Sequence, residues 1–251
     1  MKKRLVFLFL QLLPLAGFLG LWQWYVAEGG RRVFLFSSPV NIGSALVKGV
    51  EQGYLFHHAW ITFIETISGF LIGNIAGISI GLGLWGSMTL ARIFRPYIIA
   101  IGSIPIFAIA PVLIVWFGIG IFSKIMMAAL STVIVAMVQS FQGAMDVDTH
   151  YLNQMKVLGA TKLQTFKKVV LPSSLIWVFS SLRLNIGFAL LGAFIGEFIS
   201  AQEGLGYFIL KASGLYDMAN VFAGLCFLIG LSIVLTWLLG LIEKRVIYWK
   251  A

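Results

Sequence analysis

Residues 146–172 read DVDTHYLNQMKVLGATKLQTFKKVVLP, a polar stretch between two strongly apolar ones. It carries two aspartates and four lysines, in a chain in which charged residues make up only 11% of the whole. Apolar residues recur in it at steps of three and four, which predicts helix with one apolar face. That face comprises Leu152, Met155, Gly159, Leu163, Phe166 and Val170. Gly159 is expected to divide the segment into two short helices joined by a turn. Such a segment either lies on a membrane surface or inserts into a partner's groove, and periodicity alone favours the membrane surface.

The chain around this segment has the composition of a membrane protein. Of its 251 residues 60% are hydrophobic and the mean hydropathy is +0.97, whereas soluble domains are about 45–50% apolar. Six stretches approach or exceed the roughly 20 apolar residues that a helix needs to cross a bilayer: 5–27, 60–85, 97–117, 125–142, 173–199 and 221–242. Runs of this length predict helices rather than the shorter alternating strands of a barrel. We therefore expect an all-α protein with six transmembrane helices, in which residues 1–251 form a single transmembrane domain.

The distribution of basic residues predicts the orientation of these spans. With an even number of spans both termini share one side, and the lysines and arginines outside the spans divide twelve to five between the two sides. One side carries Lys2, Lys3, Arg4, Arg92, Arg95, Lys156, Lys162, Lys167, Lys168, Lys244, Arg245 and Lys250, and the other Arg31, Arg32, Lys48, Lys124 and Lys211. The positive-inside rule then places both termini and residues 146–172 in the cytoplasm. The net charge of +9 is thereby explained by topology, and no nucleic-acid partner is expected. The first span reads as an uncleaved anchor, because its apolar run exceeds a signal-peptide core.

Glycines in the second expected span predict close helix packing. Gly69, Gly73, Gly77 and Gly81 recur every four residues and share one face of the helix. Small residues at that spacing allow another backbone to approach closely. We expect this face to pack inside the protein, with a contact between two copies as the alternative. In the third span, Pro105 and Pro111 interrupt the hydrogen-bond ladder and predict a kink.

Three charged residues fall within spans: Glu65, Arg183 and Glu197. A charge at the centre of a span costs about 2.5–3.5 kcal/mol, so each should face the protein interior or a water-filled cavity. They are candidates for the translocation pathway, with structural pairing to neighbouring groups as the alternative. Two carboxylates in the outer half would repel an oxyanion, so this hypothesis favours a neutral or cationic organic solute, such as a nitrogen heterocycle.

The sequence offers little support for catalysis or metal binding. The chain has three histidines and one cysteine, at no spacing typical of a metal site or a catalytic triad. Cys226 is expected to be a small packing residue in the last span. Residues 81–87 read GLGLWGS and lack the lysine of a phosphate-binding loop. We therefore predict no catalytic residue, no metal and no cofactor on this chain, and expect any ATPase to be a separate protein.

Several motifs, in order, resemble those of one transporter family. They are Pro105, Ala108 and Pro111; Trp116, Phe117 and Gly118; Leu158, Gly159 and Ala160; Phe166, Val169, Leu171 and Pro172; Leu182, Arg183 and Glu197; and Gly204, Leu205, Gly206 and Tyr207. Together they resemble the permease subunits of bacterial ABC importers, in particular the nitrate, sulfonate and taurine group, over about residues 36–245. The resemblance implies a type I ABC importer permease fold in the bacterial inner membrane.

The resemblance also implies partners and site residues. The permease would form a homodimer, bind two cytoplasmic ATPase subunits that use ATP and magnesium, and receive solute from an extracytoplasmic binding protein. Residues 146–172 would be the coupling segment, and the residues implied to contact the ATPase are Met155, Leu158, Gly159, Ala160, Thr161, Phe166 and Pro172. The chain departs from the family pattern in two places: Asn153, Gln154 and Met155 stand where Glu-Ala-Ala is usual, and Glu65 stands where a basic residue is usual.

Two other classes of protein are compatible with six spans. A stand-alone secondary transporter tends to show inverted repeats with broken helices at matching positions, and no convincing internal repeat is present here. A membrane scaffold would not need the coupling segment. We therefore expect an importer permease.

Overall fold

The computed structural model describes residues 2–246, with side chains at position 10 and from position 13 onward. Every regular element in this part is helical, which confirms the all-α prediction there. The helices are α1 (Lys2–Val26), α2 (Arg31–Phe36), α3 (Pro39–Glu51), α4 (Tyr54–Leu84), α5 (Met88–Gly102), α6 (Ile106–Phe117), α7 (Ile121–Met145), α8 (Thr149–Val157), α9 (Lys162–Thr165), α10 (Leu171–Ser200), α11 (Leu205–Gly214) and α12 (Met218–Val246). A π-helical turn, Phe166–Val170, joins α9 to α10.

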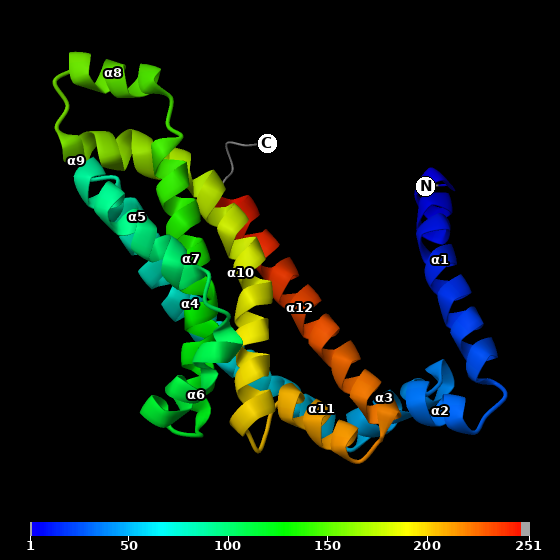
Figure 1. Ribbon diagram of the computed structural model, residues 1–251. Helices are drawn as coiled ribbons and strands as arrows, with labels where there is room; N and C mark the ends of the chain where they lie inside the picture. The colour runs from blue at the N-terminus through cyan, green and yellow to red at the C-terminus, as the bar shows by residue number, and fades with distance from the viewer. Residues whose placement is uncertain (1, 247–251) are drawn as a thin grey trace.

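Three long helices, α4, α7 and α10, form the centre of the molecule, and α12 lies beside α10 (Figure 1). The four glycines of α4 face α7 and leave no room for a side chain. A Cβ at Gly69 would lie 2.6 Å from the carbonyl oxygen of Ile125, and one at Gly77 would lie 2.7 Å from the Cβ of Ala136. The helix α10 approaches α7 equally closely: a Cβ at Gly192 would lie 2.7 Å from the Cα of Ala128. The core therefore rests on direct backbone contact between helices, as small residues permit.

A buried amide pair adds specificity to this packing. The side chain of Asn185 on α10 donates to the side-chain oxygen of Asn74 on α4 at 2.6 Å and to the carbonyl oxygen of Thr132 on α7 at 3.2 Å. Both asparagines are buried. Polar groups without water must find partners within the protein, so this network fixes the register of the three helices.

Four helical stretches in the described residues are long and apolar enough to cross a membrane: α4, α7, the continuous stretch Lys162–Ser200, and α12. The bent pair of α5 and α6 makes a fifth if it counts as one span. The helix α1, expected as the first span, has 25 residues, but its side chains are described only in part. The total of six spans therefore stays a prediction.

The third expected span, residues 97–117, is not one helix. It breaks at residues 103–105, and α5 and α6 meet at an angle of 91°. Pro105 has no N–H to donate and disfavours helical backbone at Ile104, and it adopts an extended conformation before α6. The prolines thus predicted an interruption, but the result is a sharp corner rather than a kinked span.

The first helix lies apart from the central bundle (Figure 1). It packs mainly against α2 and α3, and Trp22 meets Phe222 of α12 with ring centroids 5.2 Å apart. The start of α1 and the end of α12 both lie at the end of the molecule that carries α8 (Figure 1). The side chains of Lys2, Lys3, Arg4 and Lys250, which entered the charge count, lie outside the described residues.

Candidate functional site

Residues 146–172, the expected coupling segment, contain two short helices, α8 and α9, joined by a turn at Gly159, which confirms the predicted break. Gly159 has φ +68°, a left-handed conformation that glycine adopts without strain. The amide of Ala160 donates to the carbonyl oxygen of Met155 at 2.9 Å across it, as in a Schellman ending. The turn therefore depends on glycine for its conformation.

Both helices of the segment begin with a side-chain cap. The carboxylate of Asp148 accepts from the amide of His150 at 2.8 Å at the start of α8. Thr161 begins α9 with a capping box: its hydroxyl accepts from the amide of Gln164 at 3.3 Å, and its amide donates to the Gln164 side chain at 2.8 Å. These caps hold the chain on both sides of Gly159.

The apolar stripe predicted for this segment does not form one exposed face. Leu152 and Phe166 pack against helices of the bundle, around Leu82 of α4, and the ring of Phe166 lies 5.6 Å from that of Trp85. Pro172 lies in the first turn of α10, so neither it nor Phe166 belongs to the exposed end. The stripe is divided because Gly159 separates α8 from α9, and α9 continues through the π-helical turn into α10.

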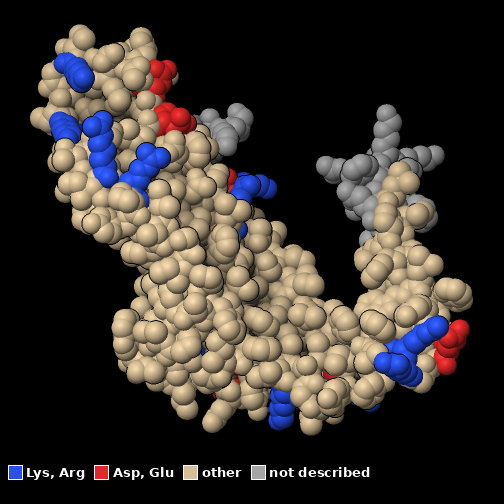
Figure 2. Space-filling view, viewed as in Figure 1, with Lys and Arg blue, Asp and Glu red and all other residues tan. Residues whose placement is uncertain are grey.

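The exposed aliphatic residues of the segment are Val157, Leu158 and Leu163, which we call the tip. Val157 is 88% exposed and Leu158 is 78% exposed. Met155 and Ala160, also predicted to contact a partner, are half-buried, whereas Gly159 and Thr161 are exposed beside the tip. Figure 2 shows basic side chains gathered at this end of the molecule. The tip thus offers an apolar surface with a basic surround at the end of the bundle.

A second concentration of polar groups lies at the opposite end, between α4, α7, α10 and α11. Glu197, fully buried on α10, accepts from the hydroxyl of Thr62 on α4 and from the amide of Gly206 on α11, both at 2.6 Å. Glu65 on α4 is 2% exposed and lies beside Glu197. We call Thr62, Glu65, Lys124 and Glu197, with the backbone of Gly204–Gly206, the outer cluster.

Lys124 supplies the positive charge of the outer cluster. Its ammonium group is buried on α7 and donates to the carbonyl oxygens of Gly120 at 3.0 Å, Ser200 at 3.3 Å and Ile119. It therefore ties the α6–α7 link to the end of α10. One side-chain oxygen of Glu65 has no hydrogen-bond partner among the described residues. The cluster holds two carboxyl groups against one ammonium group.

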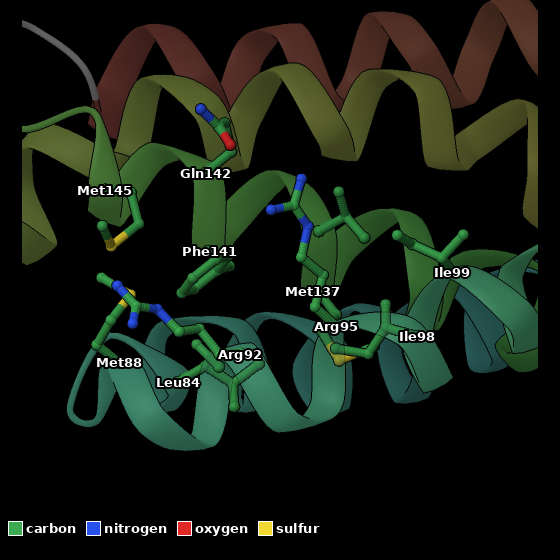
Figure 3. Close-up of a pocket in the computed structure, with 12 residues that line it drawn as sticks. Leu84, Met88, Arg92, Arg95, Ile98, Ile99, Met137, Phe141, Gln142 and Met145 are labelled. Carbon is green, nitrogen blue, oxygen red and sulfur yellow. The ribbon is translucent and has the colours of Figure 1, made fainter.

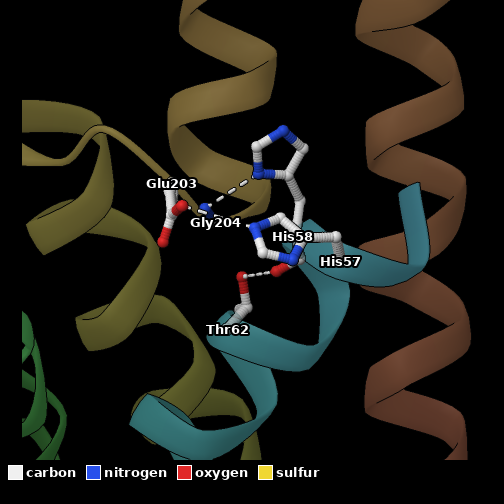
Figure 4. A network of polar contacts seen from close by, with 5 residues as sticks. All are labelled: His57, His58, Thr62, Glu203 and Gly204. Atoms are coloured by element: carbon white, nitrogen blue, oxygen red, sulfur yellow. Dashed lines mark hydrogen bonds and ion pairs between the residues drawn. The ribbon is translucent and has the colours of Figure 1, made fainter. Parts of the chain in front are cut away.

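The start of α4 lies beside the link that precedes α11 (Figure 4). The amide of Gly204 donates to Nδ1 of His58 at 3.1 Å, and Nε2 of His57 lies 3.4 Å from a carboxylate oxygen of Glu203. The amide of Leu205 donates to the hydroxyl of Thr62 at 2.9 Å. The glycine-rich link before α11 is thus held by α4 along its length, and the expected short helix within 202–220 is present as α11.

The three candidate pathway residues do not come together. Glu65 and Glu197 meet in the outer cluster, whereas Arg183 lies further along α10 and forms an ion pair with Glu243 of α12. The Arg183 side chain is 57% exposed, so in this protomer it does not face a closed interior. Its ion pair with a neighbouring helix matches the alternative expectation, in which Arg183 has a structural role and does not contact the solute.

Sequence reasoning overlooked Thr62, His58 and Lys124 as members of a site. Lys124 was counted only as a loop charge, although it begins an apolar run. Thr62 precedes Glu65 by three residues and Glu65 precedes Gly69 by four, so all three share the glycine face of α4. That spacing was the available signal that Glu65 would face α7.

Comparison with known proteins identifies the family. Residues 69–248 match the family described as "Binding-protein-dependent transport system inner membrane component". The chain belongs to this family. It is 29% identical to the riboflavin transport system permease protein of Chloroflexus aurantiacus, over 92% of this chain and 86% of that protein. It is 28% identical to a putative aliphatic sulfonates transport permease protein of Bacillus subtilis, over 95% and 86%.

The fold agrees with a solved transporter structure. The chain matches a chain of the inward-facing MetNI methionine ABC transporter with a TM-score of 0.70 at 19% identity, covering 78% of this permease and 97% of that chain. This permease is accordingly an ABC transporter subunit and a multi-pass protein of the inner membrane. Its relatives are transport components rather than catalysts.

Proposed function

We propose that this permease forms the translocation pathway of a homodimeric ABC importer and takes its energy from a separate cytoplasmic ATPase. The observation that carries the proposal is the tip. Val157, Leu158 and Leu163 are exposed at the far end of the bundle, on a capped and glycine-shaped turn. An exposed apolar tip with a fixed conformation is suited to insertion into a groove of a partner protein. Two ATPase subunits, one for each tip, would use ATP and magnesium.

The topology of the proposal follows from the positions of the helix ends. The start of α1 and the end of α12 share the end of the molecule that carries α8 (Figure 1). If the tip meets a cytoplasmic ATPase, both termini are cytoplasmic and the outer cluster lies toward the solute-binding protein. The basic residues at the α8 end then follow the positive-inside rule.

The displaced first helix supports a second copy of the permease. Along α1, Leu10, Leu21 and Trp24 are 58%, 67% and 75% exposed, on a helix set apart from its own bundle. The bilayer covers part of this surface. A neighbouring protomer packed between α1 and the bundle would cover the remainder.

Copurification tests the coupling role. We expect the full chain, purified with its natural partners, to copurify with a nucleotide-binding subunit. Leu158→Glu should abolish this, because a carboxylate would enter an apolar groove. Leu215→Glu is the matched control, since Leu215 is 71% exposed next to α11 at the opposite end. Equal loss in both variants, or retention in both, contradicts the proposal.

The cargo is proposed to be a small neutral or cationic organic solute, such as a nitrogen heterocycle. The outer cluster carries two carboxyl groups against one ammonium group, which disfavours an oxyanion nearby. The relative named for riboflavin transport supports a ring-shaped organic solute. Thermal protection of the partner solute-binding protein by candidate solutes tests this, and tight binding of nitrate or an alkanesulfonate would refute it.

A secondary transporter working alone is the competing function. It predicts that the permease, reconstituted without other subunits, moves solute down an ion gradient. The importer proposal predicts no uptake until the ATPase and ATP are supplied.

A further inference from the structure

A cavity between α5 and α7 has a chemistry that the transport function does not use. Its volume is about 440 Å³, within the range of ligand pockets. It runs along most of α5, from Met88 to Ile99, and along the last turns of α7, from Met137 to Met145. Nine of its twelve lining residues are apolar, and the three polar ones are Arg92, Arg95 and Gln142.

The two arginines share one side of α5 and have no acidic partner. Arg92 and Arg95 are three residues apart, so they lie on one helix face. Both side chains extend from α5 on the side facing α7 (Figure 3). None of the salt bridges among the described residues involves either of them. The cavity therefore combines apolar walls with two uncompensated guanidinium groups.

We propose that this cavity binds the headgroup of an anionic phospholipid from the inner leaflet, with its phosphate between Arg92 and Arg95 and acyl carbons along the apolar wall. Guanidinium groups match phosphate oxygens in geometry and charge. Basic pockets between transmembrane helices on the cytoplasmic side bind anionic lipid headgroups for this reason.

The apolar walls distinguish this ligand from a free anion. Met88 and Ile99 on α5, with Phe141 and Met145 on α7, line the cavity along its length. A phosphate ion gains nothing from these surfaces, whereas an acyl chain does. The arginines also lie at the depth where the positive-inside rule places the inner headgroups. A lipid can contact both the arginines, through its phosphate, and the apolar walls, through its acyl chains.

Lipid binding to the purified transporter tests the proposal. The full chain, with its copurifying subunits, is stripped of lipid in detergent and titrated with dioleoylphosphatidylglycerol, with dioleoylphosphatidylcholine, or with inorganic phosphate, and bound lipid is counted by native mass spectrometry. We expect phosphatidylglycerol to bind about 25-fold more tightly than phosphatidylcholine, because each basic residue near an anionic lipid contributes a factor of about five. The substitution R92Q/R95Q should bring the two affinities together.

Two further variants separate a built site from diffuse attraction. K167Q/K168Q removes the same charge from exposed lysines on the same side of the membrane and should change the preference less than threefold. Val138→Trp fills the apolar wall with both arginines intact and should weaken binding of both lipids. Equal loss in R92Q/R95Q and K167Q/K168Q, unchanged binding in Val138→Trp, competition by millimolar phosphate, or no preference for phosphatidylglycerol would each overturn the proposal.

Discussion

Substitution of Gly159 tests how the turn of the coupling segment acts. The backbone at Gly159 has φ +68°, and a Cβ placed there would meet no atom within 4 Å. A side chain at this position therefore strains the backbone without causing a clash. Left-handed backbone costs an ordinary residue about 1–2 kcal/mol, less for asparagine and most for a β-branched residue. The expected order of damage is Asn, then Ala, then Val.

The magnitude follows from the population of the native turn. Since about 1.4 kcal/mol corresponds to a tenfold change in an equilibrium, a strain of about 1 kcal/mol in Gly159→Ala lowers the native turn about fivefold relative to other conformations. For Gly159→Val, at about 2 kcal/mol, the factor is about 25. We expect the ratio of solute transported to ATP hydrolysed to fall in the same order, while Gly159→Asn stays within about twofold of the native protein.

The assay measures uptake and ATP hydrolysis in parallel, in liposomes that contain the permease, its ATPase and its solute-binding protein. Gly83 is the matched control, because a Cβ there also meets nothing within 4 Å but the backbone is not left-handed. Gly83→Ala and Gly83→Val should transport normally. Native coupling in Gly159→Val, or damage from asparagine equal to that from valine, would refute the conformational reasoning.

Two stability predictions address the helix core and the outer cluster, each measured by thermal unfolding of the permease in detergent. Glu197→Gln should destabilise the permease by about 1–3 kcal/mol, because an amide has one oxygen and cannot accept both hydrogen bonds that the carboxylate accepts. Glu65→Gln should destabilise it less, since one oxygen of Glu65 accepts no hydrogen bond among the described residues. Equal losses of stability in the two variants would contradict the assignment. Gly73→Ala should cost about 1–3 kcal/mol, because its Cβ would meet the backbone of α7. Gly83→Ala should not change stability, because a Cβ there meets no atom. Identical unfolding temperatures for the two alanine variants would contradict the inference that close contact between α4 and α7 stabilises the permease.

Features set by local chemistry could be predicted from the sequence. The turn at Gly159 follows from a glycine between two periodic segments, and the all-helical architecture follows from the length of the apolar runs. The interruption near Pro105 follows from the missing amide hydrogen. Each depends on a few neighbouring residues, and the structure shows each of them.

Features set by the relative placement of helices could not be predicted. The stripe from Leu152 to Val170 follows one helical period in sequence. Its two ends nevertheless pack on the bundle, whereas Leu163 in its middle is exposed, as is the neighbouring Leu158. Contacts with Leu82 of α4 and Ala144 of α7 place both ends, and no residue of the π-helical turn after α9 is a recognised signal for such a turn. Similarly, Lys124 neutralises part of the outer cluster only because α7 begins beside the end of α10.

The path from the tip to the outer cluster runs through α10. From Lys162 to Ser200 the chain is a continuous helical stretch of 39 residues, and α10 alone extends about 45 Å at the helical rise. Gly192 and Gly196 hold it against α7 so closely that a Cβ at either would collide, which prevents α10 from rotating independently. If the tip couples to an ATPase as proposed, a displacement at Leu158 would therefore move α4, α7 and α10 together. Because Glu197 holds the start of α11 at the other end, that movement would be passed on to α11.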